Sequence, residues 1–181
     1  MQDELKLLSR ARTLDKDALT QIHDRYYEAI FRYISFRVSN LQSVEDLTGE
    51  VFVRFLHALR EKSAPQNTIR GWLYGTASRV VKEHYRREGR ATFTPLNDGL
   101  ADEQVDLAEK TQAKFDKESL QQSITELTDQ QQHVLAMRFG QGMAIREVAE
   151  VMNKSQGSIK MLQARAIAAL GRKLSRKETG G

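Results

Sequence analysis

Residues 144–174 carry two helical patterns joined by a short turn, and this arrangement constrains the chain more than any other feature. The first pattern places apolar residues on one helical face: Ile145, Val148, Ala149 and Met152. Asn153 follows, and asparagine tolerates the left-handed conformation of a sharp helix end. Ser155 is a favourable N-cap for a second helix. The sequence therefore predicts a helix-turn-helix.

The second helix of this motif has two different faces. Its apolar face consists of Ile159, Leu162, Ala166 and Leu170, and its opposite face consists of Lys160, Met161, Ala164, Arg165 and Arg172. A helix-turn-helix that reads DNA requires this division, because one face anchors the helix while the other enters the major groove. The alternative is an ordinary helical hairpin with a solvated basic face.

The net charge of +4 is distributed unevenly along the 181 residues. Residues 1–90 carry 16 basic and 12 acidic residues, residues 91–118 carry 3 and 7, and residues 119–181 carry 9 and 5. Two basic blocks therefore flank an acidic segment, which fits two nucleic-acid-facing domains on a linker. Small domains also differ by a few charges without any functional cause.

Composition excludes several function classes. The chain has no cysteine, which excludes disulfides and thiolate catalysis and suits a reducing cytoplasm. Its first residues include acidic groups and no long apolar run, unlike a signal peptide. No stretch reaches the ~18 apolar residues of a membrane span. The histidines lie far apart and no phosphate-binding glycine loop is present. We therefore expect no catalytic residues, no metal site and no cofactor.

The N-terminal part predicts a series of amphipathic helices. Asp15 is expected to cap a helix that runs to about Val38. Ser43 is expected to begin another, with the apolar stripe Val44, Leu47, Val51, Phe55 and Leu59. Early in this helix lie three acids, Glu45, Asp46 and Glu50. Two interpretations stay open for them: a favourable interaction with the helix dipole, or a charged surface for a protein partner.

A polar loop, residues 61–69, precedes a long helix with a basic stripe. Its apolar side includes Leu73, Ala77 and Val80. Another side carries Trp72, Thr76, Arg79, Lys82, Arg86 and Arg90, with Arg87 beside them. Such a stripe can follow phosphates while its aromatic residue stacks on an exposed base. The alternative is a core tryptophan beside a solvated basic face.

Residues 91–117 lack a sustained apolar stripe, and we expect them to form an acidic, flexible linker. Helical patterning resumes over residues 118–175, where Thr128 and Gln131 have capping-box spacing. Residues 176–181 are predicted to be a disordered tail. The predicted fold class is all-α, with two small helical domains, residues 1–90 and 118–175, on either side of the linker.

Three segments carry a family resemblance in their order and spacing: VEDLTGEVFVRFLHAL, then WLYGTASRVVKEHYRR, then LTDQQQHVLAMRF with REVAEVMNKSQGSIKMLQARAIAAL. The chain resembles a bacterial RNA polymerase sigma factor of the extracytoplasmic-function type, in group 4 of the sigma-70 family. The resemblance covers residues 15–90 and 118–174.

The resemblance implies a promoter-specific initiation factor that binds core RNA polymerase and helps to melt the −10 region. The first domain is similar to sigma-2, a helical bundle that binds the β′ clamp helices and the −10 element. The second is similar to sigma-4, whose helix-turn-helix binds the −35 element, with the β flap as its polymerase partner. The resemblance also implies promoter DNA as a ligand and an anti-sigma factor as a regulatory partner, without membrane insertion.

The resemblance assigns roles to three residue sets. The polymerase-binding residues would be Glu45, Asp46, Glu50 and Arg54. The −10 DNA-binding residues would be Asn67, Trp72, Arg79, Lys82, Arg86, Arg87 and Arg90. The −35 DNA-binding residues would be Ser155, Gln156, Ser158, Lys160, Met161, Ala164 and Arg165. The chain departs from the family pattern, which often has Gln at Gly49, Asn at Arg79, and an aromatic residue before Trp72 where Thr68 and Ile69 stand.

Two alternatives belong to other function classes. A stand-alone helix-turn-helix regulator accounts for residues 118–174 but leaves residues 15–90 without a role. A helical adaptor that binds only protein predicts no salt-sensitive DNA binding.

Overall fold

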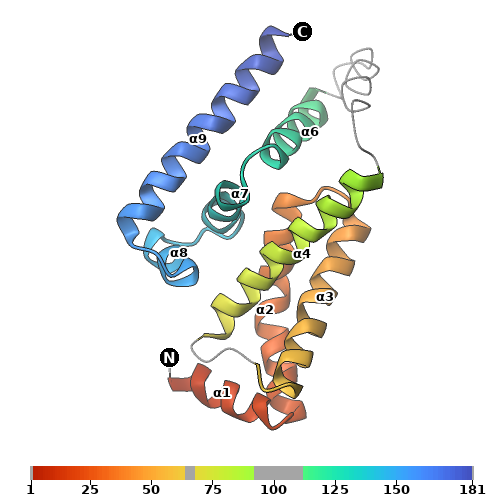
Figure 1. Cartoon of the computed structure of the whole chain (residues 1–181), viewed down its shortest axis with the longest axis vertical. Coiled ribbons are helices and arrows are strands. Elements are labelled where there is room, and N and C mark those ends of the chain that lie inside the picture. Colours follow the sequence, from red (N-terminus) through yellow and green to blue (C-terminus); the bar gives the residue numbers. More distant parts are fainter. Residues whose placement is uncertain (1, 64–67, 92–111, 181) are drawn as a thin grey trace.

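The computed structural model describes residues 2–63, 68–91 and 112–180, and within these ranges the regular structure is entirely helical (Figure 1). This confirms the predicted all-α class. The helices are α1 (Gln2–Arg12), α2 (Lys16–Arg37), α3 (Leu41–Arg60), α4 (Ile69–Ala91), α6 (Gln112–Thr125), α7 (Asp129–Leu135), the π-helix η2 (Ala136–Gly140), α8 (Ile145–Met152) and α9 (Gln156–Thr179). None of these helices is long and apolar enough to cross a membrane.

Helices α1 to α4 form the N-terminal half, in which α2, α3 and α4 lie side by side and α1 crosses one end (Figure 1). Asp15 caps α2 as predicted, and its carboxylate accepts a hydrogen bond from the Ala18 amide at 3.0 Å. The predicted start of α3 is wrong by two residues. Asn40 is the N-cap and accepts from the amide of Ser43, which lies inside the helix. Asn and Ser are both good caps, so the sequence alone did not distinguish them.

Helices α6 to α9 form the C-terminal half. The capping box at the start of α7 is confirmed, because Thr128 and Gln131 each bond the other's backbone amide. Helix α6 begins at Gln112, earlier than the predicted start of the second domain. Helix α9 continues to Thr179, so residues 176–179 of the predicted disordered tail are helical.

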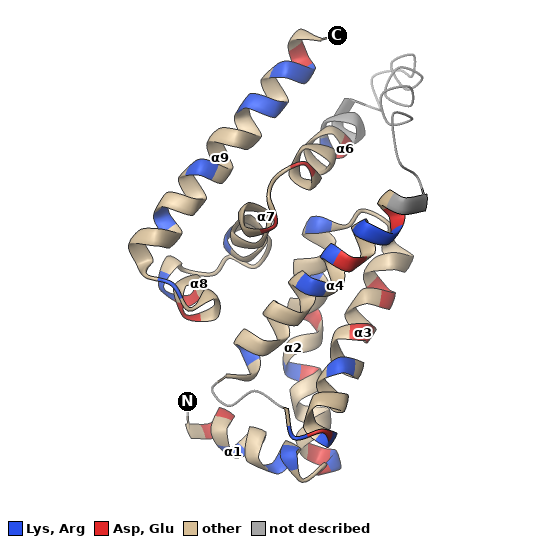
Figure 2. Ribbon diagram, viewed as in Figure 1, with Lys and Arg blue, Asp and Glu red and all other residues tan. Residues whose placement is uncertain are grey.

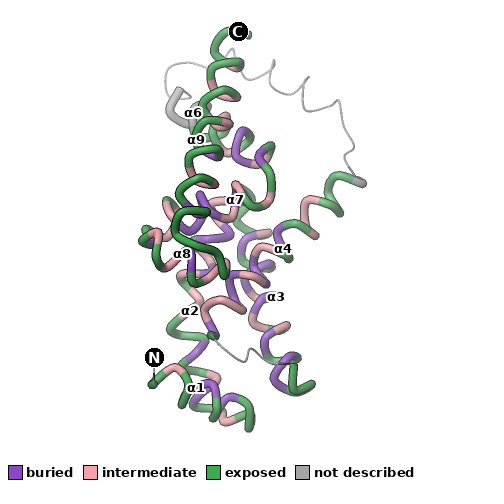
Figure 3. Tube along the Cα trace, turned by 60° about the vertical axis from the view of Figure 1, so that its left-hand side comes forward, coloured by how far each residue is buried: buried purple, intermediate pink, exposed green. Residues whose placement is uncertain are grey.

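The two halves pack directly against each other. One continuous hydrophobic cluster contains buried residues of both, including Ile34 and Tyr74 from the N-terminal half and Met137, Val148 and Ile159 from the C-terminal half. Helix α2 contacts η2, and α4 contacts α8. Figure 3 shows buried residues where these elements meet. Residues 92–111, most of the predicted linker, lie outside the described residues.

Candidate nucleic-acid interface

The helix-turn-helix has the local geometry that its sequence predicts. Asn153 ends α8 in the left-handed conformation, with φ 52° and ψ 49°. Ser155 then caps α9, and its hydroxyl accepts from the Ser158 amide at 3.1 Å. The buried Ala149 lets the two helices cross closely. These confirmed features fix the direction in which α9 leaves the turn.

The outward face of α9 is open to solvent. Ile159 and Ala166 are fully buried, which sets the orientation of the helix about its axis. All seven residues predicted to bind the −35 element are exposed, and the Met161 side chain is 57% exposed. The first turn presents backbone amides and the positive end of the helix dipole, which favours phosphate. Lys160 and Arg165 lie further along the same helix.

Arg138 in η2 positions this helix, a role that sequence reasoning missed. Its Nε donates to Gln163 Oε1 of α9 at 2.7 Å, and its Nη1 donates to the Met143 carbonyl. Near the other end of α9, Lys173 forms an ion pair with Glu126 at 3.4 Å. Lys177 donates to Ser123 at 3.0 Å. These two lysines therefore anchor α9 on α6 and on the residue that follows it, while the residues near the start of α9 stay available.

The basic stripe of α4 is present, but some of its side chains already contact other parts of the chain. Arg79, Lys82, Arg86 and Arg87 are exposed, and Figure 2 shows basic residues along this helix. The Lys82 ammonium contacts Asp129 of α7 at 3.0 Å. The Trp72 ring is half-buried and meets Phe55 edge-on, with centroids 5.3 Å apart. The ring therefore packs on the core while part of it stays open to solvent, and its role in stacking on a base stays a prediction. Asn67 and the side chain of Arg90 lie outside the described residues.

The acids of α3 lie beyond its first turn, because the helix begins at Leu41. The dipole effect falls off within one turn, so it does not explain Glu45 or Asp46, which are both exposed. Glu50 is different, since it binds Arg54 at 3.0 Å. Arg54 also reaches Glu83 of α4 at 2.6 Å. This hydrogen bond raises the pKa of Arg54 and lowers the pKa of Glu83, so Arg54 joins two helices.

An aromatic patch beside these acids was missed from the sequence. It consists of His23, Tyr27 and Phe31 on α2 and Phe52 on α3, with ring centroids 4.9 to 6.3 Å apart. Val53 and Leu56 beside it on α3 are 49% and 41% exposed. Glu45, Phe52 and Leu56 share one helical face, so apolar and acidic groups form one surface. The i, i+4 spacing of the three α2 rings was the available signal.

Nothing in the described ranges suggests a metal centre, since no group of three or more His, Asp or Glu side chains there could hold an ion. Among the histidines, His133 is largely covered and its ring meets Tyr33 of α2 edge-on. Burial, reinforced by the charge of Arg37, lowers the pKa of His133 to about 3. His133 is therefore neutral and structural at physiological pH.

Comparison with known proteins identifies both halves. The family model of sigma-70 region 2 matches residues 22–91, and that of sigma-70 region 4 matches residues 124–172. The ECF RNA polymerase sigma factor BldN of Streptomyces coelicolor is 30% identical over 172 residues, which is 94% of this chain and 65% of BldN. The RNA polymerase sigma factor YlaC of Bacillus subtilis is 29% identical over 164 residues, which is 89% of this chain and 94% of YlaC.

A solved structure, CnrH in complex with the cytosolic domain of CnrY, has the same fold, with a TM-score of 0.65 and 21% identity over 95% of this chain and 97% of that chain. The match to region 2 accounts for the N-terminal half, so the alternative of a stand-alone helix-turn-helix regulator is wrong. The two matched regions, in this order and together with the similarity to BldN and YlaC, show that the chain belongs to the sigma-70 family and is a sigma factor of the extracytoplasmic-function type.

Proposed function

We propose that this sigma factor binds core RNA polymerase through α2 and α3 and directs it to promoters by reading a −10 element with α4 and a −35 element with α9. One observation carries the proposal: each of the two matched sigma regions presents an exposed basic helix, α4 in one and α9 in the other (Figure 2). A protein that only binds other proteins has no need of two such helices.

In the −35 reader, side chains divide by their position on α9. Lys160, Met161, Ala164 and Arg165 face the major groove, where cations donate to guanine and apolar groups touch a thymine methyl. Gln156 and Ser158 lie at the start of the helix and contact phosphate. The Ser155 hydroxyl already caps the helix, so its role is to orient these two residues.

In the −10 reader, α4 holds the non-template strand. Arg79, Arg86 and Arg87 contact phosphates, and the solvent-facing side of Trp72 supports an unpaired base. Unstacking a base costs a few kcal/mol, which stacking and charge contacts offset. Asn67 belongs to the loop that would receive the base, and Lys82 joins the stripe once it leaves Asp129.

The polymerase contact uses Glu45 and Asp46 together with the aromatic patch. Acids beside half-buried rings and the exposed Val53 and Leu56 suit the β′ clamp helices, because charge steers the approach and burial of the apolar groups stabilises the complex. Glu50 and Arg54 hold this surface on α4. The C-terminal half would meet the β flap. We also propose that the chain acts in the cytoplasm, is not itself an enzyme, and has an anti-sigma partner.

Gel filtration with purified core RNA polymerase tests the proposal. We expect the chain to co-elute with core polymerase, and the complex to bind promoter DNA with a preference that the free chain lacks. If the chain instead bound a duplex operator with full specificity without polymerase and never co-eluted with it, the proposal would be wrong.

A further inference from the structure

The start of α4 is capped in part by a residue of α1. The first amides of a helix have no acceptor within the helix itself. In α4 the amides of Ile69 and Arg70 both donate to Oε1 of Glu4, at 3.0 and 3.4 Å. The next amide, that of Gly71, donates to the hydroxyl of Thr68 at 3.1 Å. Glu4 lies 65 residues before Ile69, so two segments far apart in the sequence complete one cap.

Glu4 is held in place by the helix that carries it and by a tyrosine. The buried residues of α1, Leu7, Leu8 and Ala11, pack this helix against α2 and α3. The hydroxyl of Tyr26, on α2, donates to the same Glu4 oxygen at 3.4 Å. Burial and the nearby charge of Glu4 raise the pKa of Tyr26, so this hydroxyl keeps its proton and stays a donor. One carboxylate oxygen therefore accepts from donors on both α2 and α4.

A carboxylate suits this position for two reasons. The N-terminus of a helix carries a partial positive charge, and hydrogen bonds to a charged acceptor are about twice as strong as neutral ones. Free amides at a helix N-terminus also bind phosphate. While Glu4 accepts the Ile69 and Arg70 amides, they are not available to a DNA phosphate. We therefore expect the phosphates of a bound strand further along α4, at Arg79 and Arg86, and not at its start.

The Thr68 part of the cap depends on the glycine that follows it. A Cβ atom at Gly71 would lie only 2.6 Å from the Thr68 hydroxyl oxygen, so glycine leaves the room that this hydrogen bond needs. Thr68 and Ile69 stand where the family pattern often has an aromatic residue. In this chain Thr68 contributes to the cap, and Ile69 is fully buried. The departure from the family pattern therefore coincides with the residues that fix the start of α4.

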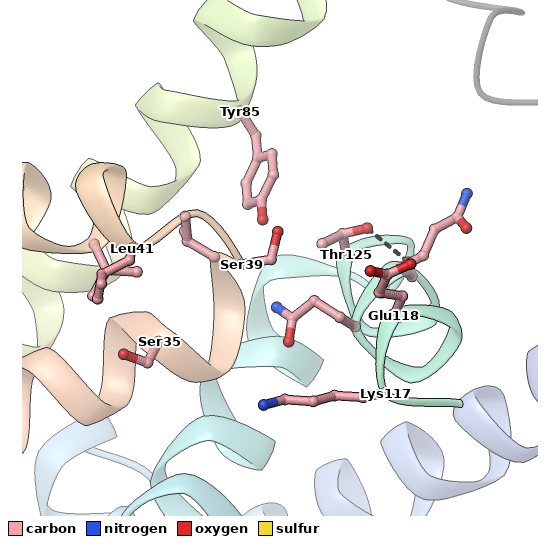
Figure 4. Close-up of a pocket in the computed structure, with 11 residues that line it drawn as sticks. Ser35, Ser39, Leu41, Tyr85, Lys117, Glu118 and Thr125 are labelled. Carbon is pink, nitrogen blue, oxygen red and sulfur yellow. Dashed lines mark hydrogen bonds between the residues drawn. The ribbon is translucent and has the colours of Figure 1, made fainter. Parts of the chain in front are cut away.

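The two ends of α4 are held differently. Near its end, Tyr85 lines a cavity of about 610 Å³ that also borders the α2–α3 corner and α6 (Figure 4). At its start, Ile69 and Leu73 are fully buried, and the cap fixes the backbone of the turn that they share. Trp72 lies in this turn, where its half-buried ring meets Phe55. The cap therefore sets where the ring of Trp72 lies.

We propose that Glu4 is a positioning residue for −10 recognition: by capping α4 from α1, it holds the ring of Trp72 where an unpaired −10 base stacks on it. The proposal rests on the assignment of α4 to the −10 element. Glu4 does not itself contact DNA, and it acts only through the first turn of α4. Loss of one stacked base lowers affinity roughly 5- to 150-fold, which sets the size of the expected effect.

The fluorescence of Trp72 tests the positioning in the free chain, because Trp72 is the only tryptophan. Loss of the cap frays the first turn, so we expect Glu4→Ala to shift the emission to longer wavelength and to increase quenching by acrylamide. Glu4→Gln keeps an acceptor oxygen, so its emission should match that of the natural chain. Asp3→Ala is the matched control, because Asp3 is an exposed acid in the same turn of α1. Loss of a cap lowers the Tm by only roughly 2–6 °C, so all these variants can be compared while folded.

With core polymerase, the same variants separate promoter opening from initial binding. We expect Glu4→Ala to lower the permanganate reactivity of −10 thymines at least ~5-fold while initial binding changes little. Glu4→Gln and Asp3→Ala should open the promoter like the natural chain. Trp72→Leu removes the stacking ring but keeps an apolar side chain on the core. In a chain that carries Trp72→Leu, Glu4→Ala should cause no further loss, because the two residues act as one unit.

The proposal would be overturned if Glu4→Ala left the emission and quenching of Trp72 unchanged, or if it opened promoters normally. It would also be overturned if Glu4→Ala caused the same loss with and without Trp72→Leu, since the cap would then serve stability alone. A wrong assignment of α4 would be recognised separately, because Trp72→Leu by itself would then open promoters normally. The fluorescence measurement needs neither DNA nor polymerase, so it does not depend on that assignment.

Discussion

Asp46 offers a sharp test of the polymerase-binding surface, because the structure separates its role in stability from a role in binding. The side chain is exposed, and its one described contact is a hydrogen bond from Gln42 Nε2 at 3.1 Å. An exposed i, i+4 pair of this kind contributes ~0.2–0.5 kcal/mol. The helix dipole adds little, because Asp46 lies beyond the first turn of α3.

We therefore expect Asp46→Arg to lower the free energy of unfolding by about 0.5 kcal/mol or less, which is a Tm shift of ~2 °C or less in a chain of this size. At a polymerase interface the same change replaces an attractive charge with a repulsive one. Such juxtapositions cost several kcal/mol, so we expect at least a ~30-fold loss of affinity for core polymerase. Fluorescence titration of labelled chain with core polymerase, at two salt concentrations, measures the affinity.

Asp17→Arg is the matched control, and we expect it to change stability but not the affinity for polymerase. Asp17 is an exposed acid in the first turn of α2, so its reversal removes a favourable dipole interaction of up to ~1 kcal/mol. It lies at the far end of α2 from the start of α3, so polymerase affinity should be unchanged. Unchanged affinity in Asp46→Arg, with normal melting, would refute our assignment of this surface.

Three further predictions concern other surfaces. Arg165→Ala should cost ~1–3 kcal/mol in promoter affinity in a way that depends on the −35 sequence, whereas Gln156→Ala should weaken all sequences equally in a binding titration. Arg86→Ala should reduce the permanganate reactivity of −10 thymines more than it reduces initial promoter binding. Unchanged reactivity would mean that Arg86 faces solvent and does not contact the DNA during opening. The pKa of His133 is about 3, below the ordinary 6.5, because of burial and the charge of Arg37, so the folded structure loses stability as the pH falls below ~6.5, by about 2 kcal/mol at pH 5. Thermal melting should therefore give a lower Tm at pH 5 than at pH 7, and the difference should be smaller in His133→Asn.

The local features of the helix-turn-helix could be predicted because each depends on neighbouring residues. Asn153 and Ser155 act through their own backbone preferences, and the outward face of α9 follows from helical periodicity. The capping box of α7 is equally local. Where two residues satisfied one local rule, as at Asn40 and Ser43, the prediction shifted by two or three positions.

The features that sequence reasoning missed depend on residues far apart in the chain. Arg37 looks like an ordinary basic residue at a helix end, yet its burial depends on Gln132, 95 residues away. Arg138 has the same character, since its partner Gln163 lies 25 residues further on. The π-helix that carries Arg138 has no simple periodic signature. A single sequence gives no signal for such pairings, so the packing of the two halves against each other could not be predicted.

The measurement that tests the central claim most directly is run-off transcription with purified core polymerase, free of other sigma factors, on fragments of the genome that encodes this chain. We expect transcripts to start at a small set of sites only when the chain is added, and to disappear when either the −35 or the −10 sequence of such a site is scrambled. The account would be contradicted if the folded chain produced no transcription start site. It would also be contradicted if scrambling the −35 and −10 sequences left the starts unchanged.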